Sequence, residues 1–78
     1  MSRITQLAIN EEGFVFDPAT GESYTVNHTG LLILKGLKEG KSEKEMADCL
    51  IEKYEVDRDE ADSDILNFMD FLKASAIL

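Results

Sequence analysis

The sequence predicts an α+β domain in which three short antiparallel strands precede three helices. Its N-terminal part holds short β-branched and aromatic runs that are separated by turn residues. The rest holds three segments whose apolar residues recur at helical spacing, each opened by a capping residue. A chain of 78 residues supports one hydrophobic core, so we expect a single domain spanning residues 1–78.

The predicted strands lie at Ile4–Ile9, Phe14–Asp17 and Ser23–Val26. The segments between them, Asn10–Gly13 and Asp17–Glu22, are rich in the asparagine, glycine, aspartate and proline residues that tight turns favour. Because strands joined by tight turns pair antiparallel, we expect a three-stranded meander. The outer strands of such a sheet keep unpaired backbone groups that invite another chain.

The first predicted helix follows the third strand almost without a linker. Asn27 is placed to cap its N-terminus, and Gly40 lies where a C-terminal cap is expected. The run Leu31–Leu34 makes this helix apolar nearly all round, which indicates deep burial. The sequence therefore predicts a strand that is fixed at its end by a buried helix.

Two more helices are predicted, and each has one apolar stripe. Ser42 and Glu45 have capping-box spacing before the second helix, and Asp57 and Glu60 repeat it before the third. The stripes consist of Met46, Ala47, Leu50 and Ile51 in the second helix, and of Ala61, Ile65, Phe68, Met69 and Leu72 in the third. Leu66 and Phe71 fall outside the third stripe, so they line a groove, pack against the tail or the sheet, or are singly exposed at the surface.

Composition and charge narrow the function classes. A net charge of -8 disfavours nucleic-acid partners, which are usually held by a basic patch. With Cys49 as the single cysteine and His28 as the single histidine, no Cys/His metal site is expected, and no cofactor. No apolar run approaches the roughly 18–20 residues of a membrane span, and no signal peptide is recognisable. We therefore expect a cytoplasmic protein.

No constellation of residues predicts catalysis. His28 stands next to Thr29, but neighbours on a helix do not face one another, so we expect His28 at the surface. Cys49 fits a small packing residue of the second helix. The acidic run Asp57–Asp64 lacks the glycine and final glutamate of an EF-hand loop. It is either a solvated helix start or a surface that attracts a basic partner.

From Phe14 to Leu78 the chain resembles the PqqD family, the pyrroloquinoline quinone biosynthesis protein D-like domains, also called RiPP precursor peptide recognition elements. The family has a strand ending in tyrosine and an aliphatic residue, an asparagine that opens an aliphatic helix, a polar capped helix, and an acidic-to-apolar third helix. The matching features are Tyr24, Val26, Asn27, Leu31–Leu34, Gly40, Ser42, Tyr54, Val56, Asp57 and the terminal pair Ile77 and Leu78. The chain departs from the family at Ala76, where glycine is common.

The resemblance implies a winged helix-turn-helix-like fold and a non-catalytic module. Such modules bind the leader segment of a ribosomally made precursor peptide as an extra strand, in a groove between the third strand and the third helix. They then present it to a modifying enzyme, often a radical S-adenosylmethionine protein. The residues implied for peptide contact are Ser23, Tyr24, Thr25, Val26, Asp64, Ile65, Asn67, Phe68, Phe71 and Leu72. Among them Ile65, Phe68 and Leu72 also fit a place in the core.

Two other functions stay open at this point. One is a structural subunit that docks to a larger enzyme without touching peptide. The other is a winged-helix DNA-binding protein, although the third helix has only Arg58 and Lys73 as cations among many acids. Ser23–Val26 is also compatible with a covered or central strand, and a strand edge that accepts a peptide also permits a homodimer instead of a monomer.

Overall fold

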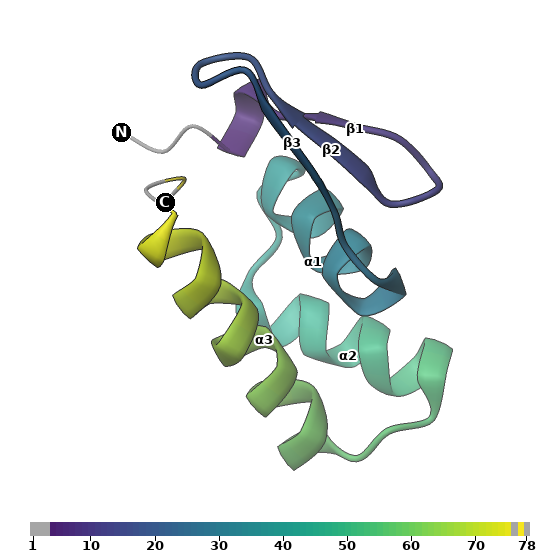
Figure 1. Cartoon of the computed structure of the whole chain (residues 1–78). Helices are drawn as coiled ribbons and strands as arrows, with labels where there is room; N and C mark the ends of the chain where they lie inside the picture. Colours follow the sequence, from purple (N-terminus) through teal and green to yellow (C-terminus); the bar gives the residue numbers. More distant parts are fainter. Residues whose placement is uncertain (1–3, 76, 78) are drawn as a thin grey trace.

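The computed structural model describes residues 4–75 and 77. It confirms the α+β prediction, with a three-stranded sheet followed by three helices, an arrangement that the winged-helix description fits (Figure 1). A short 3-10 helix precedes the sheet. The elements are η1 (Ile4–Gln6), β1 (Ala8–Ile9), β2 (Phe14–Asp17), β3 (Glu22–Thr25), α1 (His28–Lys38), α2 (Glu43–Tyr54) and α3 (Arg58–Ala74).

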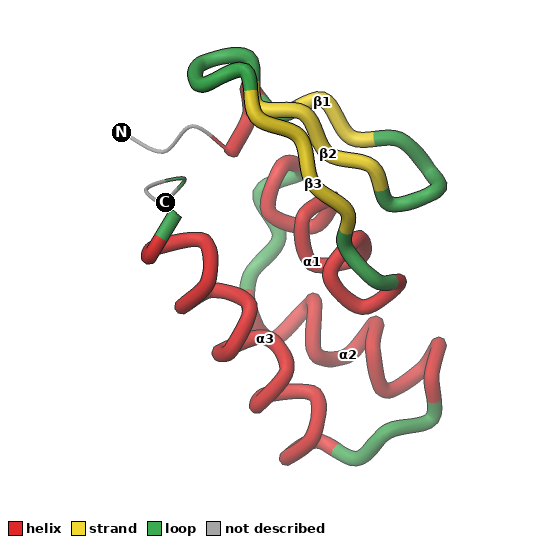
Figure 2. The backbone as a smooth tube through the Cα atoms, viewed as in Figure 1, coloured by secondary structure: helices red, strands yellow, loops and turns green. Residues whose placement is uncertain are grey.

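The sheet is an antiparallel meander in the order β1-β2-β3. In the β2–β3 register Val15 lies opposite Tyr24 and Phe14 lies opposite Thr25. β2 is therefore the central strand, and β3 has a strand neighbour on one side only within the described residues. Figure 2 shows the sheet above α1, α2 below that helix, and α3 beside it, with the C-terminal end of α3 rising toward the sheet.

The prediction of a strand at Ile4–Ile9 is wrong over most of that range, because only Ala8 and Ile9 pair with β2. Ile4–Gln6 instead forms a 3-10 turn, closed by a 3.4 Å hydrogen bond from the Leu7 N–H to the Ile4 carbonyl. Residues three apart share one side of a 3-10 turn, whereas in a strand they point to opposite faces. The turn thus lets Ile4 and Leu7 both enter the core, where they are 6% and 1% exposed.

The predicted caps of α2 and α3 are confirmed. Ser42 Oγ accepts the Glu45 N–H, and the Glu45 carboxylate accepts the Ser42 N–H in return. The Asp57 carboxylate accepts the Glu60 N–H at 2.7 Å. Gly40 follows the end of α1 with a φ of 78°, a left-handed conformation that glycine adopts without strain.

The junction between β3 and α1 is held from both sides. The Val26 N–H donates to the Gly13 carbonyl at 2.9 Å, and the Asn27 side chain accepts the Gly30 N–H at 2.8 Å. Gly13 has a φ of 94°, and a Cβ at this position would lie 2.5 Å from the Val26 carbonyl oxygen. The end of β3 is therefore fastened both to the β1–β2 turn and to the first turn of α1.

Two apolar clusters make up the core, and α1 contributes to both. One cluster joins the sheet to α1 and the C-terminal part of α3 through Ile4, Leu7, Val15, Leu34, Leu72 and Ile77. The other joins the three helices through Ile33, Met46, Ala47, Leu50, Ala61 and Ile65. Phe68 is partly buried and packs against both clusters. The expected burial of the first helix is confirmed, and it fixes α3 relative to the sheet.

Candidate functional site

The free edge of β3 presents backbone groups at two residues. In an antiparallel pair, residues alternate between those that hydrogen-bond across the pair and those that do not. Val26, which directly follows β3, is a hydrogen-bonding position, because its N–H donates to the Gly13 carbonyl. Tyr24 lies two residues earlier, so its N–H and C=O groups also point toward β2. Ser23 and Thr25 therefore direct their N–H and C=O groups away from the sheet. Their four groups form the edge that another strand requires.

Aromatic rings connect this edge to α3. The rings of Tyr24 and Phe71 meet edge to face, with centroids 6.1 Å apart and an interplanar angle of 78°. Phe68 lies next to Phe71, with ring centroids 5.8 Å apart. Phe71 stays 45% exposed, although it is a large apolar residue. An exposed aromatic ring beside a free strand edge is a surface that an apolar side chain can cover.

Phe71 lines two hollows: one lies between the start of α1 and α3, and the other lies between β3 and the C-terminal end of α3. The Asp64 hollow has a volume of about 320 Å³ and is lined by Asn27, Thr29, Gly30, Ile33, Asp64, Asn67, Phe68 and Phe71. The Glu22 hollow has a volume of about 380 Å³ and is lined by Asp17, Thr20, Glu22, Ser23, Tyr24, Phe71, Ser75 and Ile77. Because Phe71 lines both hollows, we treat them together as the β3–α3 groove.

Gly30 sets the depth of the Asp64 hollow. A Cβ at Gly30 would lie 2.9 Å from Cε1 of Phe68 and 3.1 Å from Cβ of Val26. The missing side chain thus allows the Phe68 ring to pack directly on the first turn of α1. The floor of the hollow is apolar for this reason, and its rim carries Asn27 and Asp64.

Three carboxyl groups that lie outside the groove have lowered pKa values. A hydrogen bond from Lys35 lowers the pKa of Glu11, and one from Arg58 lowers the pKa of Asp48. Hydrogen bonds from Ser42 lower the pKa of Glu45. These shifts belong to exposed ion pairs and to a helix cap.

A family model described as Coenzyme PQQ synthesis protein D (PqqD) matches residues 12–78. The chain belongs to the PqqD family. Two solved structures resemble it closely in fold. One is a lasso peptide synthetase B1 complexed with the leader peptide, with 32% identity, a TM-score of 0.77, and coverage of 91% of this chain and 85% of that one.

The second is TbiB1 in complex with the TbiA(beta) leader peptide. It shows 26% identity to this PqqD-family domain and a TM-score of 0.80, and the match covers 92% of this chain and 85% of TbiB1. No curated protein matches the chain.

The structure places most of the predicted contact residues of this PqqD-family domain around one groove. The residues that line its hollows are Ser23, Tyr24, Asp64, Asn67, Phe68 and Phe71. Thr25 lies on the edge itself, and Val26 is half-buried against the core. Leu66 is 59% exposed and lines neither hollow. That these residues contact a peptide stays a prediction.

Two predicted contact residues are placed differently. Ile65 is 2% exposed and Leu72 is 0% exposed, and each belongs to one of the two core clusters. They hold α3 in position beneath the groove and have no surface to offer to a peptide. Residues 64, 67, 68 and 71 lie on the neighbouring face of the same helix, which therefore forms the wall.

The residues that sequence reasoning missed come from the start of α1. Asn27, Thr29, Gly30 and Ile33 line the Asp64 hollow, so the groove is built by three elements and not by two. One signal for this was present in the sequence: a glycine in the first turn of a strongly apolar helix marks a place where another group approaches closely.

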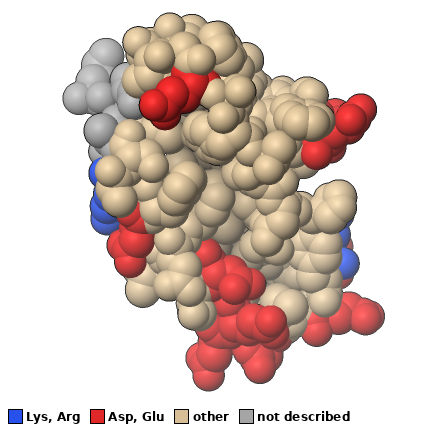
Figure 3. All heavy atoms as spheres, in the orientation of Figure 1, with Lys and Arg blue, Asp and Glu red and all other residues tan. Residues whose placement is uncertain are grey.

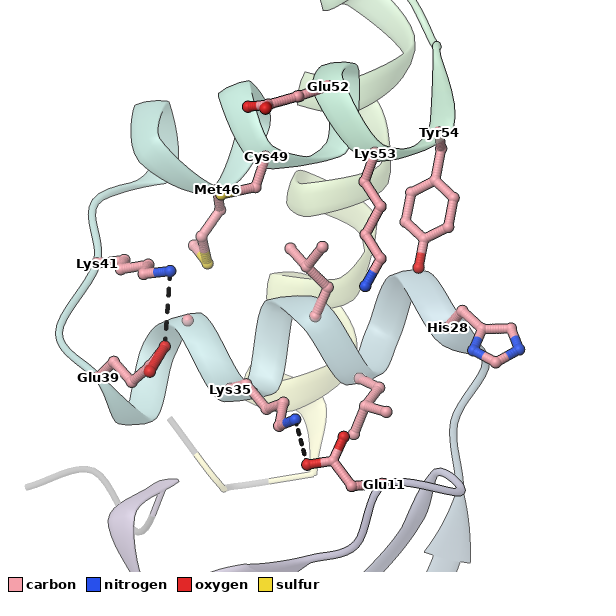
Figure 4. A pocket seen from close by; sticks show the side chains of 13 residues that line it. Glu11, His28, Lys35, Glu39, Lys41, Met46, Cys49, Glu52, Lys53 and Tyr54 are labelled. Carbon is pink, nitrogen blue, oxygen red and sulfur yellow. Dashed lines mark hydrogen bonds and ion pairs between the residues drawn. The ribbon is translucent and has the colours of Figure 1, made fainter.

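A third hollow of about 690 Å³ lies between α1 and α2, as Figure 4 shows. Ion pairs join Lys35 to Glu11 and Lys41 to Glu39 at its rim. His28 stands at the start of α1, apart from half-buried Cys49 on α2. In the described ranges, 4–75 and 77, no three His, Cys, Asp or Glu residues gather to hold a metal ion. Within the same described residues, no helix is long and apolar enough to cross a membrane.

Proposed function

We propose that this PqqD-family domain binds the leader segment of a ribosomally made precursor peptide as a strand added beside β3. The observation that carries the proposal is the free β3 edge, where Ser23 and Thr25 direct backbone groups outward next to the aromatic wall of α3. Both similar structures are leader-peptide complexes, which supports the same role for this chain.

Strand addition uses the two kinds of surface that the groove combines. Main-chain hydrogen bonds to the edge provide affinity without regard to sequence, and pockets for alternate side chains provide specificity. Side chains of an added strand point alternately to its two faces, and those on the inner face enter the hollows on either side of Phe71. The groove therefore recognises an extended peptide through the side chains at alternating positions that lie against Phe71 and its neighbours.

The role that follows is recognition and delivery, while a separate modifying enzyme, such as a radical S-adenosylmethionine protein, performs the chemistry. The outer face of the sheet supports an enzyme partner. Phe14 and Phe16 are 54% and 45% exposed there, opposite Thr25 and Ser23. Exposed aromatic neighbours on a small acidic protein are typical of an interaction surface. A strand added to β3 extends this face, so the enzyme meets the domain and the peptide together.

Replacement of both phenylalanines tests this arrangement. The double variant Phe14→Ser, Phe16→Ser is expected to keep its affinity for the peptide and to lose most of the enzyme-catalysed modification. Phe14 and Phe16 point away from the helices, so the melting temperature is expected to change little. Modification at the wild-type rate in a reconstituted reaction contradicts the assignment of this face to the enzyme.

The peptide-binding proposal is tested by an amide-resolved NMR titration. The probes are short overlapping peptides from the precursor encoded beside this gene. Shifts are expected at β3, at the start of α1 and along α3, with saturation at a defined stoichiometry. Shifts confined to the α1–α2 hollow, or no shifts with any peptide, contradict the proposal. A docking subunit without peptide binding gives the second result while still binding the enzyme.

A further inference from the structure

The β3–α3 groove has a one-sided charge. Among the described side chains that line its two hollows, Asp64, Asp17 and Glu22 carry carboxyl groups, and none is a lysine, arginine or histidine. Figure 3 shows the same asymmetry from outside: acidic atoms gather over the N-terminal part of α3, and the surface between α3 and β3 shows no basic atoms. The described side chains around a peptide in this groove therefore carry a net negative charge.

Asp64 is the acidic residue of the hollow that an inward-pointing peptide side chain would enter. It is half-buried, and it forms no ion pair with any residue in the described part of the chain. Asn67 and Phe68 follow it at helical spacings of three and four, so the three side chains share one face of α3. The ring of Phe71 closes the same hollow. A carboxylate above aromatic rings is a suitable environment for an organic cation.

We propose that the leader peptide carries a lysine or arginine at the position that enters the Asp64 hollow. Its aliphatic stem lies on the rings of Phe68 and Phe71, and its charged end pairs with the Asp64 carboxylate and the Asn67 amide oxygen. Long basic side chains bury their stems on apolar surface in this way while their heads reach a polar rim. The inference rests on the proposed peptide binding and specifies which peptides the groove accepts.

The start of α1 opposes this assignment only weakly. A helix N-terminus is equivalent to roughly half a positive charge, which favours anions. At α1, however, the Gly30 N–H is already bonded to the Asn27 side chain, so part of that capacity is used. The full charge of Asp64 and the net charge of -8 outweigh the remainder. A cation is therefore favoured over a carboxylate in the hollow.

The charge distribution also fixes where the basic residue lies along the groove. On α3, Asp64 follows the acidic start of the helix, where Asp57 is the N-cap and Asp59, Glu60 and Asp62 come next. At the other end, Glu22 is exposed, and Asp17 is buried and accepts the Ala19 N–H. The stronger attraction is at the Asp64 end. The leader therefore places its basic residue toward the N-terminus of α3.

The experiment uses the overlapping precursor peptides described above, and its readout is the dissociation constant by fluorescence anisotropy. In the peptide that binds best, each lysine or arginine is replaced singly by norleucine, which keeps an aliphatic stem without the charge. One replacement is expected to weaken binding about tenfold, the loss for a charge-assisted hydrogen bond at a half-exposed site. The variant Asp64→Asn is expected to raise the dissociation constant of the parent peptide by the same factor.

The two changes are then combined. Asp64→Asn and the norleucine peptide together are expected to lose no more than either alone, because both remove the same pair. Asp62→Asn is the matched control, since Asp62 is exposed and lines neither hollow. It is expected to change the dissociation constant less than about twofold, as an exposed charge does. Circular dichroism checks that both variants keep their helices.

Three results overturn the inference. They are a bound peptide without a basic residue, a norleucine peptide that binds as well as its parent, and additive losses in the combined measurement. In each case peptide binding at the groove still stands, and a neutral side chain fills the hollow. If no precursor peptide shifts the amides of β3 and α3, the proposed function itself fails and this inference fails with it.

Discussion

The substitution Thr25→Pro tests the strand edge most directly. Thr25 lies opposite Phe14 in a pair that forms no cross-strand hydrogen bonds, so its N–H points away from β2. Proline removes that donor and leaves the β2–β3 ladder intact, and its fixed φ near -65° remains within the β region. Proline is tolerated on edge strands for this reason. The change is therefore aimed at the peptide and spares the fold.

The expected loss of affinity follows from the bonds at this one position. Removing a main-chain hydrogen bond costs between about 0.5 and 1.5 kcal/mol, and leaving the facing peptide carbonyl without a donor costs about 1–3 kcal/mol. Both ranges partly count the loss of the same hydrogen bond, so they do not add in full. We expect the binding free energy to weaken by a total of about 1.5–3 kcal/mol. Since about 1.4 kcal/mol changes an affinity tenfold, the dissociation constant is expected to rise roughly ten- to hundredfold.

Fluorescence anisotropy with a labelled precursor peptide measures the effect, and thermal unfolding by circular dichroism monitors the fold. Thr25→Val is the matched control, because valine keeps the N–H and the preference for strand conformation. It is expected to bind as the wild type does. Tyr24→Pro is the opposite control: its N–H faces β2, so this variant is expected to lose stability.

The reasoning is refuted if Thr25→Pro binds peptide within about twofold of the wild type while its helices and sheet persist, because a hydrogen bond of ordinary strength is worth more than that. Loss of binding by Thr25→Val as well as by Thr25→Pro also contradicts it. In that case the side chain of Thr25 matters, and its backbone does not.

Two further predictions concern stability and pH. Gly30→Ala is expected to push the Phe68 ring into the Asp64 hollow, so that peptide affinity falls severalfold. Overpacking is expected to lower the free energy of unfolding by about 1–3 kcal/mol, partly offset by the higher helix propensity of alanine. Urea unfolding measures the stability and anisotropy measures the affinity; unchanged affinity contradicts the role given to this glycine. Ser42→Ala is expected to cost about 0.5–2 kcal/mol at neutral pH through loss of the cap. It is also expected to raise the pKa of Glu45, which in the folded protein lies below its ordinary value of 4.5. A lowered folded pKa stabilises above the ordinary value, and this contribution is lost as the pH falls through the folded value. The stability gap between wild type and variant therefore narrows in acid, and a gap of constant size from neutral to acidic pH contradicts this coupling.

The helices were predictable because their signals are local. The Asn27 and Asp57 caps and the reciprocal Ser42–Glu45 box depend on residues three apart, and the structure confirms all of them. The second strand was predictable for a similar reason, since β-branched and aromatic residues lie between the turn segments Asn10–Gly13 and Asp17–Glu22. The error at Ile4 has a tertiary cause: the gain from burying Ile4 together with Leu7 decides its conformation, and no local pattern reports it.

The site was predictable in outline only. Resemblance to the PqqD family indicated the third strand and the third helix, and six of the implied residues line the two hollows of the groove. Helical spacing does not show which part of the apolar stripe of α3 the neighbouring elements cover, so Ile65 and Leu72 could not be separated from Phe68. The part contributed by Gly30 depends on a close approach in space, which a linear pattern does not contain.

The fastened junction at Val26 has a consequence for the thermodynamics of association. Because Gly13 and Asn27 already immobilise the end of β3, the receiving strand loses little conformational entropy when a guest arrives. Nearly all of the ordering cost then falls on the leader, which must give up the freedom of an unstructured chain. A leader stiffened in an extended form, by cyclisation for example, would consequently bind more tightly without a single additional contact.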